Sequence, residues 1–144
     1  MMLPGGTVTF LFLDIEGSTG LLERIGADYP QLLATYREIT ERAVDRHGGA
    51  IFGSEGDGLF AAFAEAGEAV RSAIETQQGF DGAEWPGRAE VKVRMGIHTG
   101  APTLIGDDYT GIDVHRAARI MSAAWGGQVL ISETTRSLIS DTAP

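Results

Sequence analysis

The spacing of apolar residues along the chain predicts an alternation of strands and helices. Residues 7–15 are almost continuously apolar, as expected for a central strand that is buried on both faces. Further along, apolar residues recur every three to four positions, which predicts helices, or in short runs and alternations, which predict strands. The predicted strands are 7–15, 50–54, 59–64, 91–98 and 128–132. The predicted helices are 18–25, 28–47, 66–78, 112–124 and 133–139.

Polar residues and glycines separate these elements. Ser18 or Thr19 is expected to cap the first helix with its side chain. Asp57-Gly58, between two apolar runs, predicts a β-hairpin. Residues 79–88, with proline and three glycines, are expected to form a surface loop, and a second loop is expected through Asp107-Asp108-Tyr109.

Strand 91–98 has the alternation of a strand with one apolar face. Its valines, Met95 and Ile97 alternate with polar residues and Gly96. Arg94 belongs to the polar set, so we expect it to be solvated or paired. His98 closes the strand and is expected to have a structural role.

The order of elements predicts the fold. A strand, a helical crossover, a hairpin, another helix and a strand make a split βαβ arrangement, the ferredoxin-like plan of the α+β class. Helices are expected to cover one face of an antiparallel-rich sheet. Residues 1–144 show no internal repeat or linker, so they are expected to form one domain.

Composition and charge narrow the functional classes. The chain of 144 residues has no cysteine, which excludes disulfides and thiolate metal sites and fits a reducing cytoplasm. No apolar stretch approaches the roughly 18 residues needed to cross a bilayer, so we expect a soluble, cytoplasmic protein with no membrane partner. The net charge of −9 repels phosphate backbones, which argues against nucleic-acid binding by this segment.

Two carboxylates are the main candidates for chemistry. Asp14 and Asp57 lie in or beside apolar strand sequence, where a charge is costly without a partner. If the hairpin lies alongside the first strand, the two converge, and such oxygen ligands suit two Mg²⁺ or Mn²⁺ ions acting on a phosphorylated substrate. The backbone N–H groups of Gly17, Ser18 and Thr19, at a helix start, would complement phosphate charge. The structural alternative is that Asp-Gly is an ordinary turn and Asp14 caps a helix.

Four segments of the chain, in sequence order, have the form of known motifs. These segments are Phe12-Leu13-Asp14-Ile15-Glu16-Gly17-Ser18-Thr19, Glu55-Gly56-Asp57-Gly58-Leu59-Phe60, Val93-Arg94-Met95-Gly96-Ile97-His98-Thr99-Gly100 and Gly111-Ile112-Asp113-Val114-His115-Arg116-Ala117-Ala118-Arg119-Ile120. Together they resemble one known family, the class III adenylate and guanylate cyclases. The first two resemble its metal-binding motifs, the third its next strand, and the fourth the helix that carries its transition-state residues.

The resemblance implies a reaction and a metal site. Members convert ATP or GTP to a 3′,5′-cyclic nucleotide and pyrophosphate with two divalent ions at the interface of a head-to-tail homodimer. It implies that Asp14 and Asp57 hold both ions, helped by the backbone carbonyl of Ile15, and that Ser18 and Thr19 lie at the phosphates.

The resemblance also assigns residues that act on the nucleotide, and two of these depart from the family pattern. Arg119 matches the arginine that stabilises charge on the phosphate. Gly53 is at the position where adenylate cyclases usually have a lysine that recognises the purine. Asp108 matches the residue that usually acts together with this lysine. His115 stands where the family has a ribose-orienting asparagine. Both departures predict weak activity. The first candidate substrate is ATP and the second is GTP.

Two further features keep a second function open. The chain ends before the strands that in the family supply a triphosphate-binding lysine. The sequence of its last motif also resembles cyclase-like domains at the N-terminus of large bacterial transcriptional regulators. The alternative is a degenerate nucleotide-binding or dimerisation module that regulates a fused effector domain. Another two-metal enzyme on a palm-like fold, such as a diguanylate cyclase, is disfavoured because its Gly-Gly-Asp/Glu-Glu/Asp-Phe turn is missing.

Overall fold

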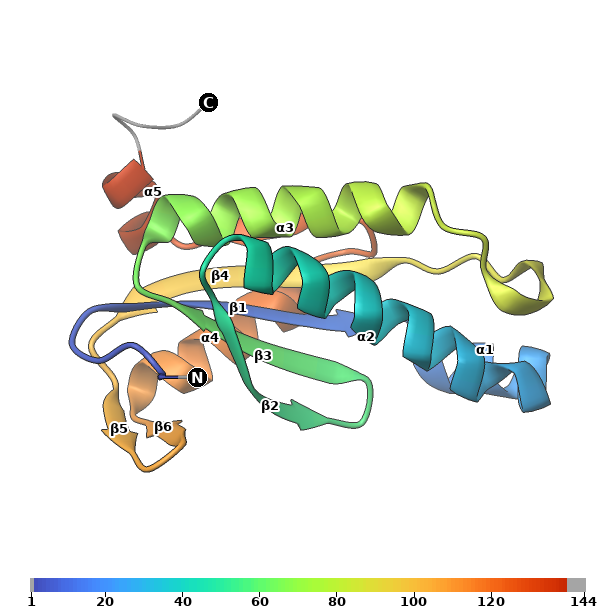
Figure 1. The fold of residues 1–144 in the computed structure, drawn as a ribbon, viewed down its shortest axis with the longest axis horizontal. Helices are drawn as coiled ribbons and strands as arrows, with labels where there is room; N and C mark the ends of the chain where they lie inside the picture. The colour runs from blue at the N-terminus through green and yellow to red at the C-terminus, as the bar shows by residue number, and fades with distance from the viewer. Residues whose placement is uncertain (1, 140–144) are drawn as a thin grey trace.

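The computed structural model describes residues 2–139, and their elements follow the predicted order (Figure 1). The strands are β1 Val8–Ile15, β2 Ala50–Glu55, β3 Gly58–Phe63, β4 Val93–Gly100, β5 Thr103–Ile105, β6 Asp108–Thr110 and β7 Val129–Ile131. The α-helices are α1 Ser18–Ile25, α2 Tyr29–Arg46, α3 Ala66–Asp81, α4 Ile112–Ala123 and α5 Glu133–Ile139. Short 3₁₀ turns occupy Gly26–Asp28 and Pro86–Arg88.

The main sheet has the order β2-β3-β1-β4-β7. β1 lies at its centre and pairs antiparallel with both β3 and β4, while β7 pairs parallel with β4. The hairpin β2–β3 therefore lies beside the first strand, as the split βαβ plan requires. This topology confirms the predicted α+β, ferredoxin-like arrangement.

The expectation that helices cover one face of the sheet is wrong. α2 and α3 cover one face, where their side chains pack with Leu11 and Leu13 of β1, and α4 covers the other, where Phe10 and Phe12 point (Figure 1). The reason lies in β1 itself. Successive side chains of a strand point to opposite faces, so a continuously apolar strand needs cover on both sides.

β4 also differs from its predicted pattern, because it begins at Val93 and is buried on both faces. Gly96 lies directly under α4, where an added Cβ atom would overlap the backbone of Met121. Gly100 lies against the first turn of α4, where a Cβ atom would overlap the carboxylate of Asp113. The glycines that made this face look non-apolar in the sequence are the means by which a helix packs closely on it.

Three local expectations need correction. The segment around Asp107-Asp108-Tyr109 forms the β5–β6 hairpin instead of a loop, because the buried Tyr109 anchors it: its hydroxyl donates to the carbonyl of Pro4 at 2.6 Å. α3 continues to Asp81, three residues beyond its predicted end. Neither Ser18 nor Thr19 caps α1; Gly17 occupies the N-cap with φ of 68°, and no side chain bonds to this end.

Within residues 2–139, no helix combines the length and the apolar character that crossing a membrane requires.

Candidate active site

Asp14 and Asp57 meet at one end of the sheet. β1 ends at Ile15, and the turn between β2 and β3 lies at the same end because β3 runs antiparallel to β1. The backbone N–H of Ile15 donates a hydrogen bond of 2.6 Å to Oδ2 of Asp57. Gly56, with φ of 59°, gives the turn the left-handed backbone that places Asp57 there. The fold therefore brings together the two carboxylates that the sequence singled out.

Arg94 is a member of this site that the sequence analysis did not assign to it. It lies directly opposite Asp14 in the β1–β4 register, and its Nε and Nη2 donate to Oδ1 and Oδ2 of Asp14 at 2.8 and 2.7 Å. The side chains are 26% and 18% exposed. The hydrogen bonds that Arg94 donates to Asp14 raise the pKa of Arg94, so its guanidinium stays charged. Arg94 is paired, as expected, and the antiparallel register of the two strands is the signal that would have identified its partner.

The donors present fit a divalent cation that keeps part of its coordination for other ligands. Asp14 and Asp57 supply carboxylate oxygens, and the carbonyl of Ile15 is the third candidate donor. Among residues 2–139 no group of three or more His, Cys, Asp or Glu side chains is placed to hold a metal. Mg²⁺ is ordinarily bound through one or two carboxylates plus water and substrate phosphates, so two carboxylates suffice for it. An arriving cation would share Asp14 with the guanidinium of Arg94 or displace it.

The start of α1 borders the same end of the sheet. Gly17 holds the left-handed N-cap position, and Ser18 and Thr19 follow in the first turn, whose N–H groups have no partner within the helix. The phenol of Tyr29 also belongs to this region: burial and the charge of Asp57 raise its pKa, and hydrogen bonding with Ser18 offsets part of that rise. Tyr29 escaped the sequence analysis because it lies in helix sequence with no motif around it.

His115 and Arg119 lie on α4, which covers the face of the sheet where Phe10 and Phe12 pack. Both side chains are exposed, and within residues 2–139 neither makes a hydrogen bond or an ion pair. Among the described residues of one chain, no hydrogen bond or ion pair connects either side chain to Asp14 or Asp57. Their exposure leaves both side chains accessible to another molecule.

Gly53 and Asp108 border one group of aromatic rings. Gly53 pairs with Phe60 across the β2–β3 hairpin, and a Cβ atom at Gly53 would lie 3.4 Å from the ring of Phe60. Asp108 is exposed and accepts a hydrogen bond of 2.8 Å from the N–H of Tyr109. The ring of Tyr109 lies 4.9 Å from that of Phe52, which neighbours Gly53. The two positions are therefore connected through aromatic side chains.

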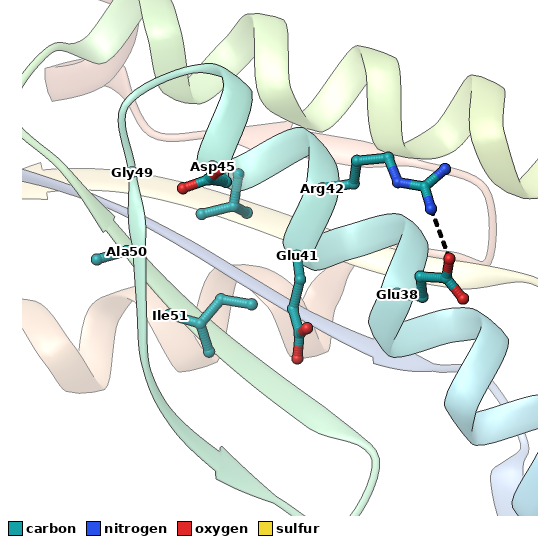
Figure 2. A pocket seen from close by; sticks show the side chains of 8 residues that line it. Glu38, Glu41, Arg42, Asp45, Gly49, Ala50 and Ile51 are labelled. Atoms are coloured by element: carbon teal, nitrogen blue, oxygen red, sulfur yellow. Dashed lines mark hydrogen bonds and ion pairs between the residues drawn. The ribbon is translucent and has the colours of Figure 1, made fainter. Parts of the chain in front are cut away.

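A groove of about 680 Å³ between α2 and the start of β2 contains none of these residues (Figure 2). Its polar lining is mainly acidic, with Glu38, Glu41 and Asp45, and its one arginine, Arg42, is paired with Glu38 at 2.5 Å. Such a lining is unsuited to phosphates. The candidate site lies instead at the end of the sheet where β1 ends.

A largely buried hydrogen bond joins α4 to β4. His98 is 5% exposed; its Nε2 lies 2.7 Å from Oδ1 of Asp113, and its Nδ1 lies 2.9 Å from the hydroxyl of Ser132. The hydrogen bond to His98 lowers the pKa of Asp113, helped by the N–H of Ala101. This confirms the structural role expected of His98.

Replacing Asp113 with Ala is expected to lower the free energy of unfolding at pH 7 by about 1–3 kcal/mol, because His98 loses its buried partner. A carboxyl whose folded pKa is lowered stabilises the fold above its unfolded pKa, and this contribution is lost as pH falls through the folded value. The difference between wild type and variant should therefore shrink below about pH 4. Urea unfolding at several pH values measures it, with Asp107→Ala, in an exposed turn, as the control. Equal stability of Asp113→Ala and wild type at pH 7 would contradict the assignment.

The fold is that of adenylate and guanylate cyclase catalytic domains. The sequence model of the adenylate and guanylate cyclase catalytic domain matches residues 2–143, and the chain belongs to this family. Among solved structures, an adenylate cyclase of Trypanosoma brucei in its monomeric state superposes with a TM-score of 0.86 at 26% identity, over 92% of this chain and 75% of that one. An adenylate/guanylate cyclase/hydrolase from Silicibacter pomeroyi gives 0.83 at 30% identity, over 94% and 80%.

Curated relatives are longer than this chain. An uncharacterised protein of Mycobacterium tuberculosis is 34% identical over 143 residues, which are 98% of this chain and 48% of that protein. The adenylate cyclase of Lachancea kluyveri is 30% identical over 90% of this chain and 8% of its own length. The chain thus spans about half or less of these relatives.

Proposed function

We propose that this domain is a nucleotidyl cyclase that converts ATP, or GTP, to the 3′,5′-cyclic nucleotide and pyrophosphate, using two Mg²⁺ or Mn²⁺ ions. The observation that carries the proposal is the meeting of Asp14 and Asp57 beside a helix start, on the fold of a family named for this activity. Both carboxylates lie at the ends of buried strands, where a charge needs a partner. A bound metal ion would be such a partner.

The residues have separate roles in this mechanism. Asp14, Asp57 and the carbonyl of Ile15 would hold the ions, which supply Lewis-acid stabilisation of the charge on the phosphates. The N–H groups at Gly17, Ser18 and Thr19 would bind the phosphate oxygens. The ribose 3′-hydroxyl would lose its proton to water as its oxygen bonds to the α-phosphorus, while the bond from the α-phosphorus to the bridging oxygen of the β-phosphate breaks and pyrophosphate leaves. Arg94 neutralises Asp14 in the chain without substrate.

The remaining roles require a second chain. Arg119 and His115 are exposed, and within one chain they do not reach Asp14 or Asp57 through any interaction of the described residues. In a head-to-tail homodimer, Arg119 of one chain would stabilise the charge on the phosphate held by the other, and His115 would orient the ribose. A monomer would then be inactive.

Activity is expected to be weak. Gly53 offers no side-chain donor to the base, and His115 differs in reach from an amide. Each lost hydrogen bond to substrate costs about 1–3 kcal/mol, or roughly tenfold to a hundredfold in rate.

With Gly53 in place of a base-reading lysine, kcat/KM for ATP and GTP should differ by less than about tenfold, because one missing hydrogen bond removes about that much discrimination. Pyrophosphate release with Mn²⁺ and either nucleotide, measured at concentrations where a dimer is verified, tests both the activity and this ratio. A strong preference for one base would refute the loose selectivity.

The second candidate is a regulatory module without turnover. It is favoured by Gly53 and His115, which depart from the sequence pattern of the family. It is also favoured by the relative of about twice this length, in which the matched region is one part of a longer protein. In that case the chain would be the N-terminal portion of a regulator that controls a fused effector domain. Calorimetry separates the alternatives: a nucleotide sensor binds ATP without producing pyrophosphate, and a pure dimerisation domain binds no nucleotide.

A further inference from the structure

Glu16 lies between the candidate metal ligands and the residues proposed to bind phosphate, and the proposed mechanism gives it no part. It follows Ile15 at the end of β1 and precedes Gly17, the N-cap of α1. Its Oε2 accepts a hydrogen bond of 2.7 Å from the backbone N–H of Gly126, 110 residues further along the chain. A carboxylate that accepts from a backbone N–H makes one of the stronger kinds of hydrogen bond. The turn that leaves β1 is therefore fastened by a side chain to a distant loop.

The loop that receives this bond, between α4 and β7, is itself anchored to β4. The N–H of Gly127 donates to the carbonyl of Val93 at 2.9 Å, and the N–H of Met95 donates to the carbonyl of Gln128 at 3.0 Å. These bonds lie on both sides of Gly126 along the β4 strand. Glu16 is thus bonded to a backbone position that the sheet holds in place.

Gly126 leaves no room for a side chain at this contact. A Cβ atom there would lie 2.5 Å from Cβ of Lys92 and 3.1 Å from Oε1 of Glu16. Lys92 also takes part through its backbone, since its carbonyl accepts a hydrogen bond of 2.8 Å from the N–H of Glu16. Glu16 is therefore held by its N–H on one side and by its carboxylate on the other.

The orientation of the helix start depends on how Glu16 is held. Gly17 follows it with φ of 68°, and the carbonyl of Gly17 accepts the first helical bond, from the N–H of Leu21 at 3.0 Å. The N–H groups of Ser18 and Thr19, in the first turn, have no partner within the helix. They are the groups to which the proposed function assigns the phosphates, and groups that bind a substrate act efficiently only when they are held in the right geometry.

We propose that Glu16 is a positioning residue, which holds the turn of residues 16–19 so that its N–H groups point at the phosphates of the bound nucleotide. The inference rests on the proposed function and adds a residue that does not itself touch the substrate. By its charge alone, a carboxylate beside bound phosphates would repel them. Positioning and repulsion therefore predict effects of opposite sign when Glu16 is replaced.

The test is calorimetry of the folded chain with inorganic tripolyphosphate in the presence of Mn²⁺, at a concentration where the oligomeric state is verified. Glu16→Ala should weaken tripolyphosphate binding by about tenfold, because the turn loses its side-chain bond. Glu16→Gln should bind at least as tightly as wild type, since its side-chain oxygen can still accept from Gly126 and the repelling charge is gone. Glu23→Ala is the control for charge: Glu23 is exposed on α1, and within residues 2–139 its side chain makes no hydrogen bond or ion pair. It should not weaken binding.

The other side of the contact gives an independent check. Gly126→Ala should weaken tripolyphosphate binding as Glu16→Ala does, because the added methyl group displaces the loop from Glu16. The two changes break the same contact, so their effects should not add in the double variant. Additive losses would show that the two residues act separately and would contradict the inference.

Two further outcomes overturn the inference and leave the proposed function standing. In one, Glu16→Ala binds tripolyphosphate as tightly as wild type or more tightly, which would reduce Glu16 to a repelling surface charge. In the other, Glu16→Gln loses as much affinity as Glu16→Ala, which would make the charge and not the hydrogen bond the cause. Wild-type protein that binds no tripolyphosphate with Mn²⁺ would instead overturn the proposed function, and the positioning role with it.

Discussion

Replacing Asp57 with Asn is expected to lower kcat/KM with Mn²⁺ and ATP by about a thousandfold or more, because a metal site with two side-chain ligands loses one of its charges. An asparagine can still accept the hydrogen bond from the N–H of Ile15 through its side-chain oxygen, so the turn between β2 and β3 should keep its shape. The loss would therefore report on metal binding and not on folding. Cyclic product formation over a range of Mn²⁺ concentrations is the measurement.

Glu55→Gln is the matched control for this experiment. Glu55 ends β2 beside the same turn and is exposed, and within residues 2–139 its side chain makes no hydrogen bond or ion pair. Its replacement removes one negative charge at nearly the same place and should change kcat/KM by less than about threefold. Similar losses in Asp57→Asn and Glu55→Gln would indicate a general electrostatic effect and count against Asp57 as a ligand.

Arg119→Ala is expected to lower kcat by about a hundredfold to a thousandfold with little change in KM, because this guanidinium acts on charge that develops in the transition state. Arg119 is exposed and has no hydrogen-bond or ion-pair partner among residues 2–139, so its removal leaves no buried group of that region unsatisfied and the melting temperature should be unchanged. Arg116→Ala, one turn earlier on the exposed side of α4, is the control and should retain most of the activity. A rise in KM with kcat intact, and hence a fall in kcat/KM, would assign Arg119 to ground-state binding.

Mixing the two inactive variants tests whether the site is shared. If Asp57 and Arg119 act in trans, each mixed dimer of Asp57→Asn and Arg119→Ala chains contains one intact site and one doubly defective site. An equal mixture that exchanges freely should recover roughly a quarter of wild-type activity, since half of the dimers are mixed. No recovery in a mixture shown to contain mixed dimers would contradict a head-to-tail arrangement.

Most of the fold could be predicted because β1 and the helices carry strong periodic signals. The positions of the helices relative to the sheet could not be predicted in the same way, although the sequence contained one indication of them. Residues 7–15 were correctly predicted to be buried on both faces, and this requires helices on both sides of the sheet. The packing of α4 over Gly96 is a contact between segments far apart in sequence, and no local sequence pattern predicts it.

The candidate site could be predicted in part for the same reason. Asp14 and Asp57 were recognisable because a carboxylate in apolar strand sequence is unusual, and the hairpin beside β1 brings them to one end. The partner of Arg94 could not be read from its own strand, since it depends on the β1–β4 register. Metal binding and the roles of Ser18 and His115 remain predictions for experiment.

The most direct test of the central claim is to follow the fate of ATP and GTP labelled at the α-phosphate, with Mn²⁺ and with the chain at a concentration where a dimer is verified. A two-metal cyclase produces the 3′,5′-cyclic nucleotide and pyrophosphate in equal amounts, and neither forms with Asp57→Asn. Labelled mono- or diphosphate without cyclic product, or unchanged nucleotide in the presence of verified binding, would contradict the account and leave the regulatory module as the function of this domain.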